Sequence, residues 1–458
     1  MTKGAFLFAI AFGAAGCSAD DKTVAEQKRH EDAPPHHDTR SEPKFAWGVE
    51  VSTVQLVNEA VNPATCPSGW TALQEQLAQG GNGHLPPLQA AYVRRFDNLY
   101  QFARASIAAH NEIGDTIPTL RLSTVWPCWA ADESWRNGMA QAVQELQNAG
   151  WRVELTLLHH DSYPANLHGG AGFDLGGWAH ESAADSFTAY AGSVIAMLRD
   201  VLPAGSRIYV ANELEASLFN GYLDTSGKWP PGGKNAGRRM AQAFLHARDA
   251  LREGVRLIRN AGLEPAIAVN VRPLLGNTGA AADRTLEHLH NWWLLDALIR
   301  GCNDDAFAGV CDTTVEPAPV TIGLTYYGHM EPSEETVELA AGIALTVPAI
   351  NVEPNADMFR QTLRDVHERY PDAALGVAEI GFSSGSIARM DGWLREYRDS
   401  VGLVLGYEER HFIQLHTLFA GAEFSEGEWH FNLIGECGEN NRSCDFTPWG
   451  ERVMEILY

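Results

Sequence analysis

The sequence predicts an α/β fold, a single (β/α)8 TIM barrel with long loops between strands and helices. From Phe45 onward, short β-rich apolar runs alternate with long amphipathic segments, which is typical of βαβ units around a parallel sheet. Eight such runs follow one another without an internal repeat or a second domain boundary, and eight parallel strands close a TIM barrel. The expected strands are residues 45–52, 119–126, 152–159, 207–212, 265–271, 320–327, 374–382 and 411–418.

Two of the segments between these strands illustrate the expected helices. Residues 138–150 and 236–262 carry apolar side chains at three- and four-residue spacing, as the buried face of a helix does. Each segment ends in a glycine, Gly150 or Gly262, and glycine after the last periodic residue is a common stop signal. In such a barrel the active site lies at the C-terminal ends of the strands.

The composition allows a globular protein and argues against nucleic acid as a partner. The 458 residues are 45% hydrophobic and 20% charged, which is ordinary for a protein with a substantial core. Lys and Arg number 34 against 58 Asp and Glu, a formal net charge of -24, which repels polyanions. A neutral substrate such as a sugar meets no such penalty.

The N-terminus resembles a bacterial lipoprotein signal. A short charged start precedes an apolar run over residues 4–15, too short to span a bilayer as a helix, and Gly16 and Cys17 follow it. We therefore expect residues 1–17 to be a signal peptide ending at the lipidated cysteine Cys17. Residues 18–44 hold almost no large apolar side chain and read as a disordered tether, before a catalytic barrel over 45–458. The expected location is an outer-membrane anchor, in the periplasm or at the cell surface, with no membrane contact beyond the lipid.

Six cysteines remain if Cys17 is lipidated, and an even number in an exported chain suits disulfide bonds. Two pairs would close short loops, and the third is what is left over; the alternative is six reduced thiols. The expected pairs are Cys302 with Cys311, Cys437 with Cys444, and Cys66 with Cys128.

Two glutamates close predicted strands, Glu213 on the fourth and Glu379 on the seventh. A carboxylate at the end of an apolar strand is costly unless it is paired or used. Two of them at one barrel mouth could serve glycoside cleavage, in which one carboxyl donates a proton to the leaving oxygen and the other attacks the anomeric carbon. The alternative is that one or both are salt-bridged or exposed to solvent.

Short motifs surround these positions, in the same order as in a known family. FAWGVEVSTVQL resembles FxWGxAxSxxQxEG, RLSTVW resembles RFSISW, and TLLHHDSYP resembles TLYHWDLP. VANEL resembles NEP, TYY resembles NYY, and VAEIGF resembles ITENG. The chain is thus similar to glycoside hydrolase family 1, the β-glucosidase family of the clan A retaining glycosidases.

The resemblance implies roles for five further residues. Gln55 and His159 would bind sugar hydroxyls, and Asn212 would hydrogen-bond the 2-OH. Arg121 would favour the ionised form of the nucleophile, and Tyr327 would orient it. Taken singly, each also has a structural interpretation: a polar residue inside the barrel, an ion-pair partner or a packed aromatic.

The sequence departs from the family where the sugar is recognised. The family motif WSLLDNFEW corresponds at best to residues 416–424, in which His416 replaces the stacking tryptophan and Glu423 is kept as a possible sugar ligand. Trp429 is a possible substitute platform, and His160 replaces the tryptophan of TLYHWDLP. The catalytic pair is kept, but specificity for glucose does not follow.

The sequence therefore predicts a retaining β-glycoside hydrolase that acts by double displacement, with Glu213 as acid/base and Glu379 as nucleophile. Its partner is a carbohydrate, and the mechanism needs no metal or organic cofactor. The alternatives are another clan A activity (endo-galactanase, mannanase or cellulase), transglycosylation, and a surface lipoprotein that binds carbohydrate without turnover.

Overall fold

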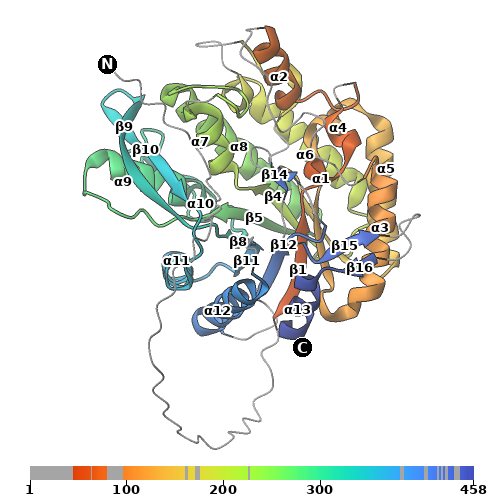
Figure 1. Cartoon of the computed structure of the whole chain (residues 1–458). Helices are drawn as coiled ribbons and strands as arrows, with labels where there is room; N and C mark the ends of the chain where they lie inside the picture. Colours follow the sequence, from red (N-terminus) through yellow and green to blue (C-terminus); the bar gives the residue numbers. More distant parts are fainter. Residues whose placement is uncertain are drawn as a thin grey trace, which may run out of the picture.

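The computed structural model contains a closed barrel of eight parallel strands (Figure 1). It describes residues 45–457, except 63, 80–95, 160–162, 171–175, 225–226, 382–385, 407–410, 420–421, 424–426, 429–431 and 438–443. The barrel strands, in their order around it, are β1 (Ala46–Val51), β12 (Phe412–His416), β11 (Leu375–Ile380), β8 (Thr321–Thr325), β5 (Glu264–Asn270), β4 (Arg207–Asn212), β3 (Arg152–Thr156) and β2 (Thr119–Ser123), which pairs with β1 again. The predicted fold class and all eight predicted strands are confirmed.

Helices surround the strands, as Figure 1 shows. They are α1 (Thr53–Leu56), α2 (Gly69–Gln79), α3 (Leu99–Ile113), α4 (Trp126–Ala131), α5 (Glu133–Asn148), α6 (Ala183–Leu198), α7 (Leu214–Leu223), α8 (Gly237–Asn260), α9 (Ala281–Glu287), α10 (Trp293–Ile299), α11 (Ala356–Arg369), α12 (Ile387–Leu405) and α13 (Pro448–Leu457). Short 3-10 turns cover Asn58–Val61, Gly114–Thr116, Ala165–Leu167 and Gly177–Ala179, and a π-helical turn covers His288–Trp292.

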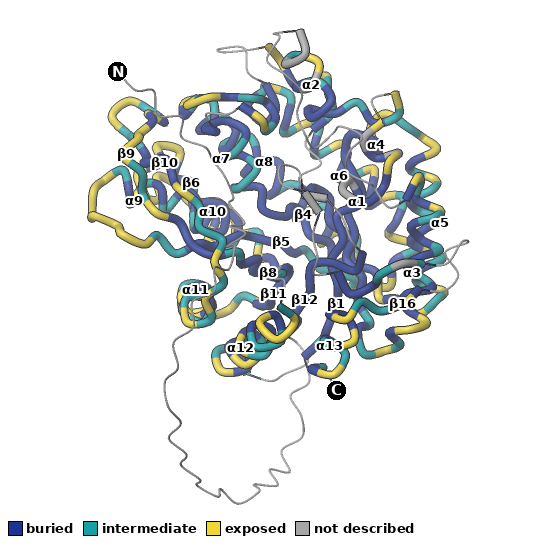
Figure 2. Tube along the Cα trace, in the orientation of Figure 1, coloured by how far each residue is buried: buried dark blue, intermediate teal, exposed yellow. Residues whose placement is uncertain are grey.

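The two helices expected from periodicity are α5 and α8, and each is followed by the expected glycine. Gly150 has φ 109° and Gly262 has φ 75°, a left-handed conformation that an L side chain rarely adopts. Figure 2 shows that the barrel strands are buried, whereas the exposed residues lie on the outer helices, the loops and the strands outside the barrel.

The inside of the barrel has its own small apolar cluster, separate from the larger core between strands and helices. It consists of Tyr209, Ala266, Ala268, Ala378 and Phe412. Two glycines make room for its rings: a Cβ on Gly323 would lie 2.4 Å from the Ala378 Cβ, and one on Gly376 would lie 2.4 Å from the Phe412 ring. These side chains fill the interior of the barrel, so the polar side chains at its C-terminal mouth pack against an apolar layer.

One large element was absent from the prediction. A hairpin of β9 (His329–Ala340) and β10 (Ile343–Asn351) follows β8 and packs against α8 and α9. It is one of the expected long loops that leave the C-terminal ends of the strands. The other small strand pairs are β6 (Cys302–Asn303) with β7 (Thr313–Thr314), β13 (Ala422–Glu423) with β14 (Gly427–Glu428), and β15 (Ile434–Cys437) with β16 (Cys444–Phe446).

The three expected disulfides are all present in the structure: Cys66–Cys128, Cys302–Cys311 and Cys437–Cys444. Cys17 and the expected tether, residues 18–44, lie outside the described residues. Within the described part of the chain, no helix is both long and apolar enough to cross a membrane.

The long-range disulfide is expected to stabilise the fold more than the local one. Cys66 and Cys128 are 62 residues apart, whereas Cys302 and Cys311 are 9 apart. From the loop entropy of the unfolded chain, replacing both cysteines by serine should lower the free energy of unfolding by about 4 kcal/mol for the first pair and about 2.5 kcal/mol for the second. Urea unfolding of the two double variants measures this. A smaller loss for Cys66/Cys128 would contradict the chain-entropy explanation.

Candidate active site

Polar side chains from seven of the eight strands or their ends meet at the C-terminal mouth of the barrel. All are buried or nearly so, although ionisable groups are rarely fully buried unless paired. They are Glu50 (β1), Arg121 (β2), His159 (just after β3), Asn212 and Glu213 (at the end of β4), Glu379 (β11) and His416 (β12), with Tyr327 just after β8 as a seventh contribution.

Glu379 is held by three donors, each from a different strand or strand end. Its Oε1 accepts a hydrogen bond of 2.8 Å from the Tyr327 hydroxyl. Its Oε2 accepts from Asn212 Nδ2 at 3.3 Å and from Arg121 Nη2 at 3.4 Å. These contacts fix the carboxylate in one orientation at the mouth of the barrel. Three of the residues that the family resemblance pointed to, Arg121, Asn212 and Tyr327, are therefore neighbours of Glu379.

Arg121 is itself completely buried, and four other acceptors hold its guanidinium group. Nε donates to Gln414 Oε1 at 2.9 Å, and Nη1 donates to Thr156 Oγ1 at 3.0 Å and to Asn212 Oδ1 at 2.9 Å. Nη2 also donates to the Ala378 carbonyl at 2.9 Å. Asn212 thus joins Arg121 to Glu379 through its two amide atoms, so the three residues form one rigid unit.

Tyr327 remains a hydrogen-bond donor at ordinary pH. Burial raises the pKa of its phenol well above the usual value, and the negative charges of Glu379 and Glu213 raise it further. A phenol that stays protonated can donate to the Glu379 carboxylate throughout the neutral range.

Glu213 occupies the turn between β4 and α7. Its backbone is left-handed, with φ 48° and ψ 44°, a conformation that costs a non-glycine residue on the order of 1–3 kcal/mol. Its N–H donates to the Ala268 carbonyl at 2.9 Å, and its carbonyl accepts from Ser217 N at 3.1 Å. The sharp turn ends the strand and starts the helix at one residue, so the Glu213 side chain lies at the barrel mouth.

A second carboxyl group next to Glu213 was missed by sequence reasoning. Burial raises the pKa of Glu215 to about 8, and the charge of Glu213 adds to the rise. Its Oε1 accepts from the Asn270 backbone N–H at 2.5 Å, and Arg272 interacts electrostatically with both glutamates. Glu215 is therefore mostly neutral at pH 7, and Glu213 does not face a second full negative charge. The Glu-x-Glu spacing was the available signal.

Glu50 was also missed, and it contacts two histidines. Its Oε1 lies 2.9 Å from His159 Nδ1, and its Oε2 lies 2.6 Å from His416 Nδ1. Glu50, Glu379 and His416 offer atoms within 4.8 Å of one another, which is close enough for a metal ion. The short carboxylate–imidazole contact accounts for this proximity without an ion.

Four residues named from the sequence have side chains outside the described set. Gln55 lies in α1, and Glu423 lies in β13; these two elements contact each other, so their backbones are neighbours. His160 and Trp429 are outside the described residues altogether.

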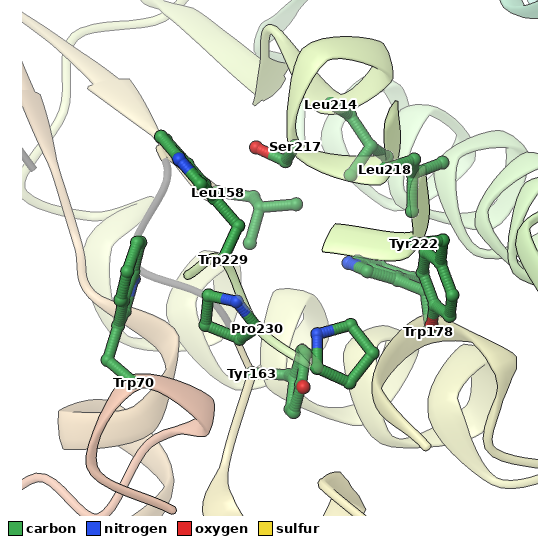
Figure 3. Close-up of a pocket in the computed structure, with 11 residues that line it drawn as sticks. Trp70, Leu158, Tyr163, Trp178, Leu214, Ser217, Leu218, Tyr222, Trp229 and Pro230 are labelled. Atoms are coloured by element: carbon green, nitrogen blue, oxygen red, sulfur yellow. The ribbon is translucent and has the colours of Figure 1, made fainter. Parts of the chain in front are cut away.

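A small cavity lies beside α7, the helix that begins after Glu213 (Figure 3). Its lining is largely apolar and aromatic, with Trp70 and Trp229 at one side, their ring centroids 5.0 Å apart, and Trp178 and Tyr222 at the other. The cavity measures about 30 Å³, more than the roughly 10–15 Å³ that one water molecule needs.

The fold and the site together define a class of protein: a TIM barrel with two carboxyl groups at strand ends. One of these groups is held by an arginine, an asparagine and a tyrosine. Residues 137–312, which include Glu213 but not Glu379, match the family model of glycosyl hydrolase family 1. No curated protein matches the chain by sequence.

Solved structures share the fold over almost the whole chain. β-Glucosidase 2 from Trichoderma reesei has a TM-score of 0.68 at 16% identity, covering 91% of this chain and 98% of that one. A rice β-glucosidase mutant in a covalent complex with Glc has a TM-score of 0.69 at 15% identity, with 91% and 98% covered. The β-glycosidase from Thermosphaera aggregans has a TM-score of 0.67 at 14% identity, with 91% and 96% covered. At these identities the likeness concerns the fold.

Tyr327→Phe removes the shortest hydrogen bond to Glu379 and leaves the ring in place. We expect kcat/KM on an aryl β-glycoside to fall by about 10²-fold, the usual effect of removing one aligned donor from a buried site. Tyr326→Phe is the matched control, because Tyr326 is buried against Phe359 and Tyr397, away from the carboxylate. Equal effects of the two substitutions would remove the positioning role of Tyr327.

Proposed function

We propose that the chain is a retaining β-glycoside hydrolase in which Glu379 is the nucleophile and Glu213 the acid/base. The observation that carries this proposal is the environment of Glu379, which accepts hydrogen bonds from Arg121, Asn212 and Tyr327 at the same barrel mouth as Glu213. The family match over residues 137–312 and the shared fold support it.

In the first step a Glu379 oxygen attacks the anomeric carbon, and Glu213 gives its proton to the leaving oxygen. The glycosyl–enzyme ester forms as the glycosidic bond breaks. In the second step Glu213, now ionised, takes a proton from water, and the water oxygen replaces Glu379 at the anomeric carbon. Two inversions give net retention.

The surroundings of each carboxyl group suit its role. Glu379 has to be an aligned anion, and its donors include a buried guanidinium group. Glu213 has to alternate between acid and anion. Arg272 interacts electrostatically with Glu213 and Glu215, and burial raises the pKa of Glu215, so that Glu215 adds little repulsion. Asn212 is bonded to Glu379 and is next to Glu213, a position from which its amide would bind the sugar 2-OH.

A screen of aryl and oligosaccharide β-glycosides with anomer-resolved products tests the proposal. Release of the β-anomer as first product supports it. Inversion would contradict the mechanism, cleavage within longer chains only would favour an endo-acting clan A enzyme, and binding without turnover would favour a carbohydrate-binding protein.

The two roles are separable by variants. Glu379→Gly should lower the rate by several orders of magnitude while sugar binding largely persists. Glu213→Ala, with a leaving group that needs no protonation, should accumulate the glycosyl–enzyme, because no base activates water. Added azide should give a β-glycosyl azide with Glu213→Ala and an α-azide with Glu379→Gly. The reverse products would exchange the two assignments.

We also propose that the protein is exported and anchored by a lipid on Cys17. The apolar run ending at Gly16 and Cys17 supports this, and three disulfides suit an oxidising compartment. In a bacterial host, Cys17→Ala should abolish labelling with a radioactive fatty acid and release the protein from the membrane fraction, while the barrel stays folded by circular dichroism. Unchanged membrane association would rule out the anchor.

A further inference from the structure

Glu50 is a completely buried carboxylate that the two catalytic steps do not use. In the barrel it is level with Arg121 of β2 and with His416 of β12, the residues that pair with it in the strand register. A buried carboxylate in a barrel interior needs compensating donors. The residues that compensate the charge of Glu50 therefore indicate its role.

Each carboxylate oxygen of Glu50 contacts one histidine. Oε1 lies 2.9 Å from His159 Nδ1, and Oε2 lies 2.6 Å from His416 Nδ1. Because an ionised carboxylate only accepts, His416 Nδ1 must carry the hydrogen in the 2.6 Å hydrogen bond. His159 Nδ1 lies at ion-pair distance from the other oxygen. In both rings the Nδ1 edge faces Glu50, so the Nε2 edge is turned away from it, and one carboxylate orients both rings.

Two departures from the family motif meet in this contact. In the segment FAWGVEVSTVQL, Glu50 occupies the position of the alanine in FxWGxAxSxxQxEG, and His416 occupies the position of the stacking tryptophan. The structure brings these two replacements to 2.6 Å. A larger side chain on β1 and a smaller ring on β12 conserve volume between them. The two changes are therefore one rearrangement of the site, with a charged hydrogen-bonding pair in place of an aromatic face.

The pKa values of the groups around Glu50 depend on its charge. Burial alone would raise the pKa of Glu50, but His159, Arg121 and the hydrogen bond from His416 outweigh it and hold the pKa well below its usual value. Burial would likewise lower the pKa of His159, yet the charges of Glu50 and Glu379 raise it above the usual value, against the opposing charge of Arg121. Tyr327 also faces this cluster and remains a neutral phenol.

We propose that Glu50 is a positioning residue that sets the tautomer and orientation of His159 and His416, so that two imidazole Nε2 edges, rather than a tryptophan face, contact the sugar bound next to Glu379. This inference rests on the proposed glycosidase function for its substrate. The site then recognises a sugar through hydroxyl groups that hydrogen-bond to imidazole, and its substrate binding depends on pH.

Glu50→Gln tests the proposal, because it keeps the shape and removes the charge. Without the anion, burial dominates, so the pH midpoint at which His159 loses its proton should fall. Two-dimensional NMR of the free protein with 15N-labelled histidine reads the midpoint and the Nδ1–H tautomer of each ring. On a β-glycoside, kcat/KM should fall by about 10- to 100-fold, chiefly through KM, and its optimum should move to lower pH.

Asp304→Asn is the matched control. Asp304 is another buried carboxylate paired with a histidine, His288, at 3.0 Å, but it lies in the segment between α10 and β8, and its hydrogen bonds are to the outer helices and to its own loop. It should leave the titration of His159 and His416 and the value of kcat/KM unchanged. The proposal is overturned if Glu50→Gln also leaves the two tautomers and midpoints unchanged.

A double-variant cycle covers the case in which Glu50→Gln folds poorly. If the two replacements form one unit, Glu50→Ala leaves a cavity and His416→Trp clashes with Glu50, whereas the double variant should melt at a higher temperature than either single variant. Additive losses would refute the coupling. Because NMR and melting need no turnover, failure of the glycosidase proposal would appear as absent activity with the histidine result intact.

Discussion

The site depends on one buried cation. Arg121 has no exposed surface, and its guanidinium group bonds to side chains or backbone of β3, β4, β11 and β12 from its own position on β2. A charge taken out of water is tolerated only when its donors are satisfied, and removing a partner leaves it uncompensated. The mouth of the barrel is therefore organised around Arg121. Glu379 is an anion that completes this set, and Asn212 links the two.

Packing below this layer keeps it in place. Phe412 fits against Gly376, and Tyr209 lies under Arg121 with its ring centroid 4.7 Å from the guanidinium carbon. Any side chain at Gly376 would overlap the Phe412 ring. The apolar cluster inside the barrel therefore leaves no room for the polar side chains at the mouth to move further into the barrel. Strand ends at fixed height and spacing are what a two-carboxylate reaction requires.

The strands and the catalytic pair were predictable because their signals are local. Parallel strands covered on both faces read as continuous apolar runs, and Glu213 and Glu379 interrupt two such runs at their ends. Glu215 was not predictable in the same way, because a glutamate in the first turn of a helix is ordinary. The β9–β10 hairpin was missed because residues 329–351 lie where a helix was expected to follow a strand.

The role of Glu50 could not be predicted from the sequence for a different reason. Within its strand it reads as one polar residue among apolar ones, and its partners are 109 and 366 positions away along the chain. Only the closed barrel, in which β1 lies next to β12, brings Glu50 to His416. The departures of Glu50 and His416 from the family motif were visible in the sequence, but their contact was not.

The central claim is that Glu379 forms a covalent bond to the sugar. A 2-deoxy-2-fluoro-β-glycoside with a good leaving group slows both steps, and the second more than the first, so the intermediate should accumulate. Proteolysis and mass spectrometry should then locate the fluorosugar on Glu379, on the peptide that contains β11, with no label on Glu213 or Glu50. A label on another residue, or turnover by an inverting route without any label, would contradict the account.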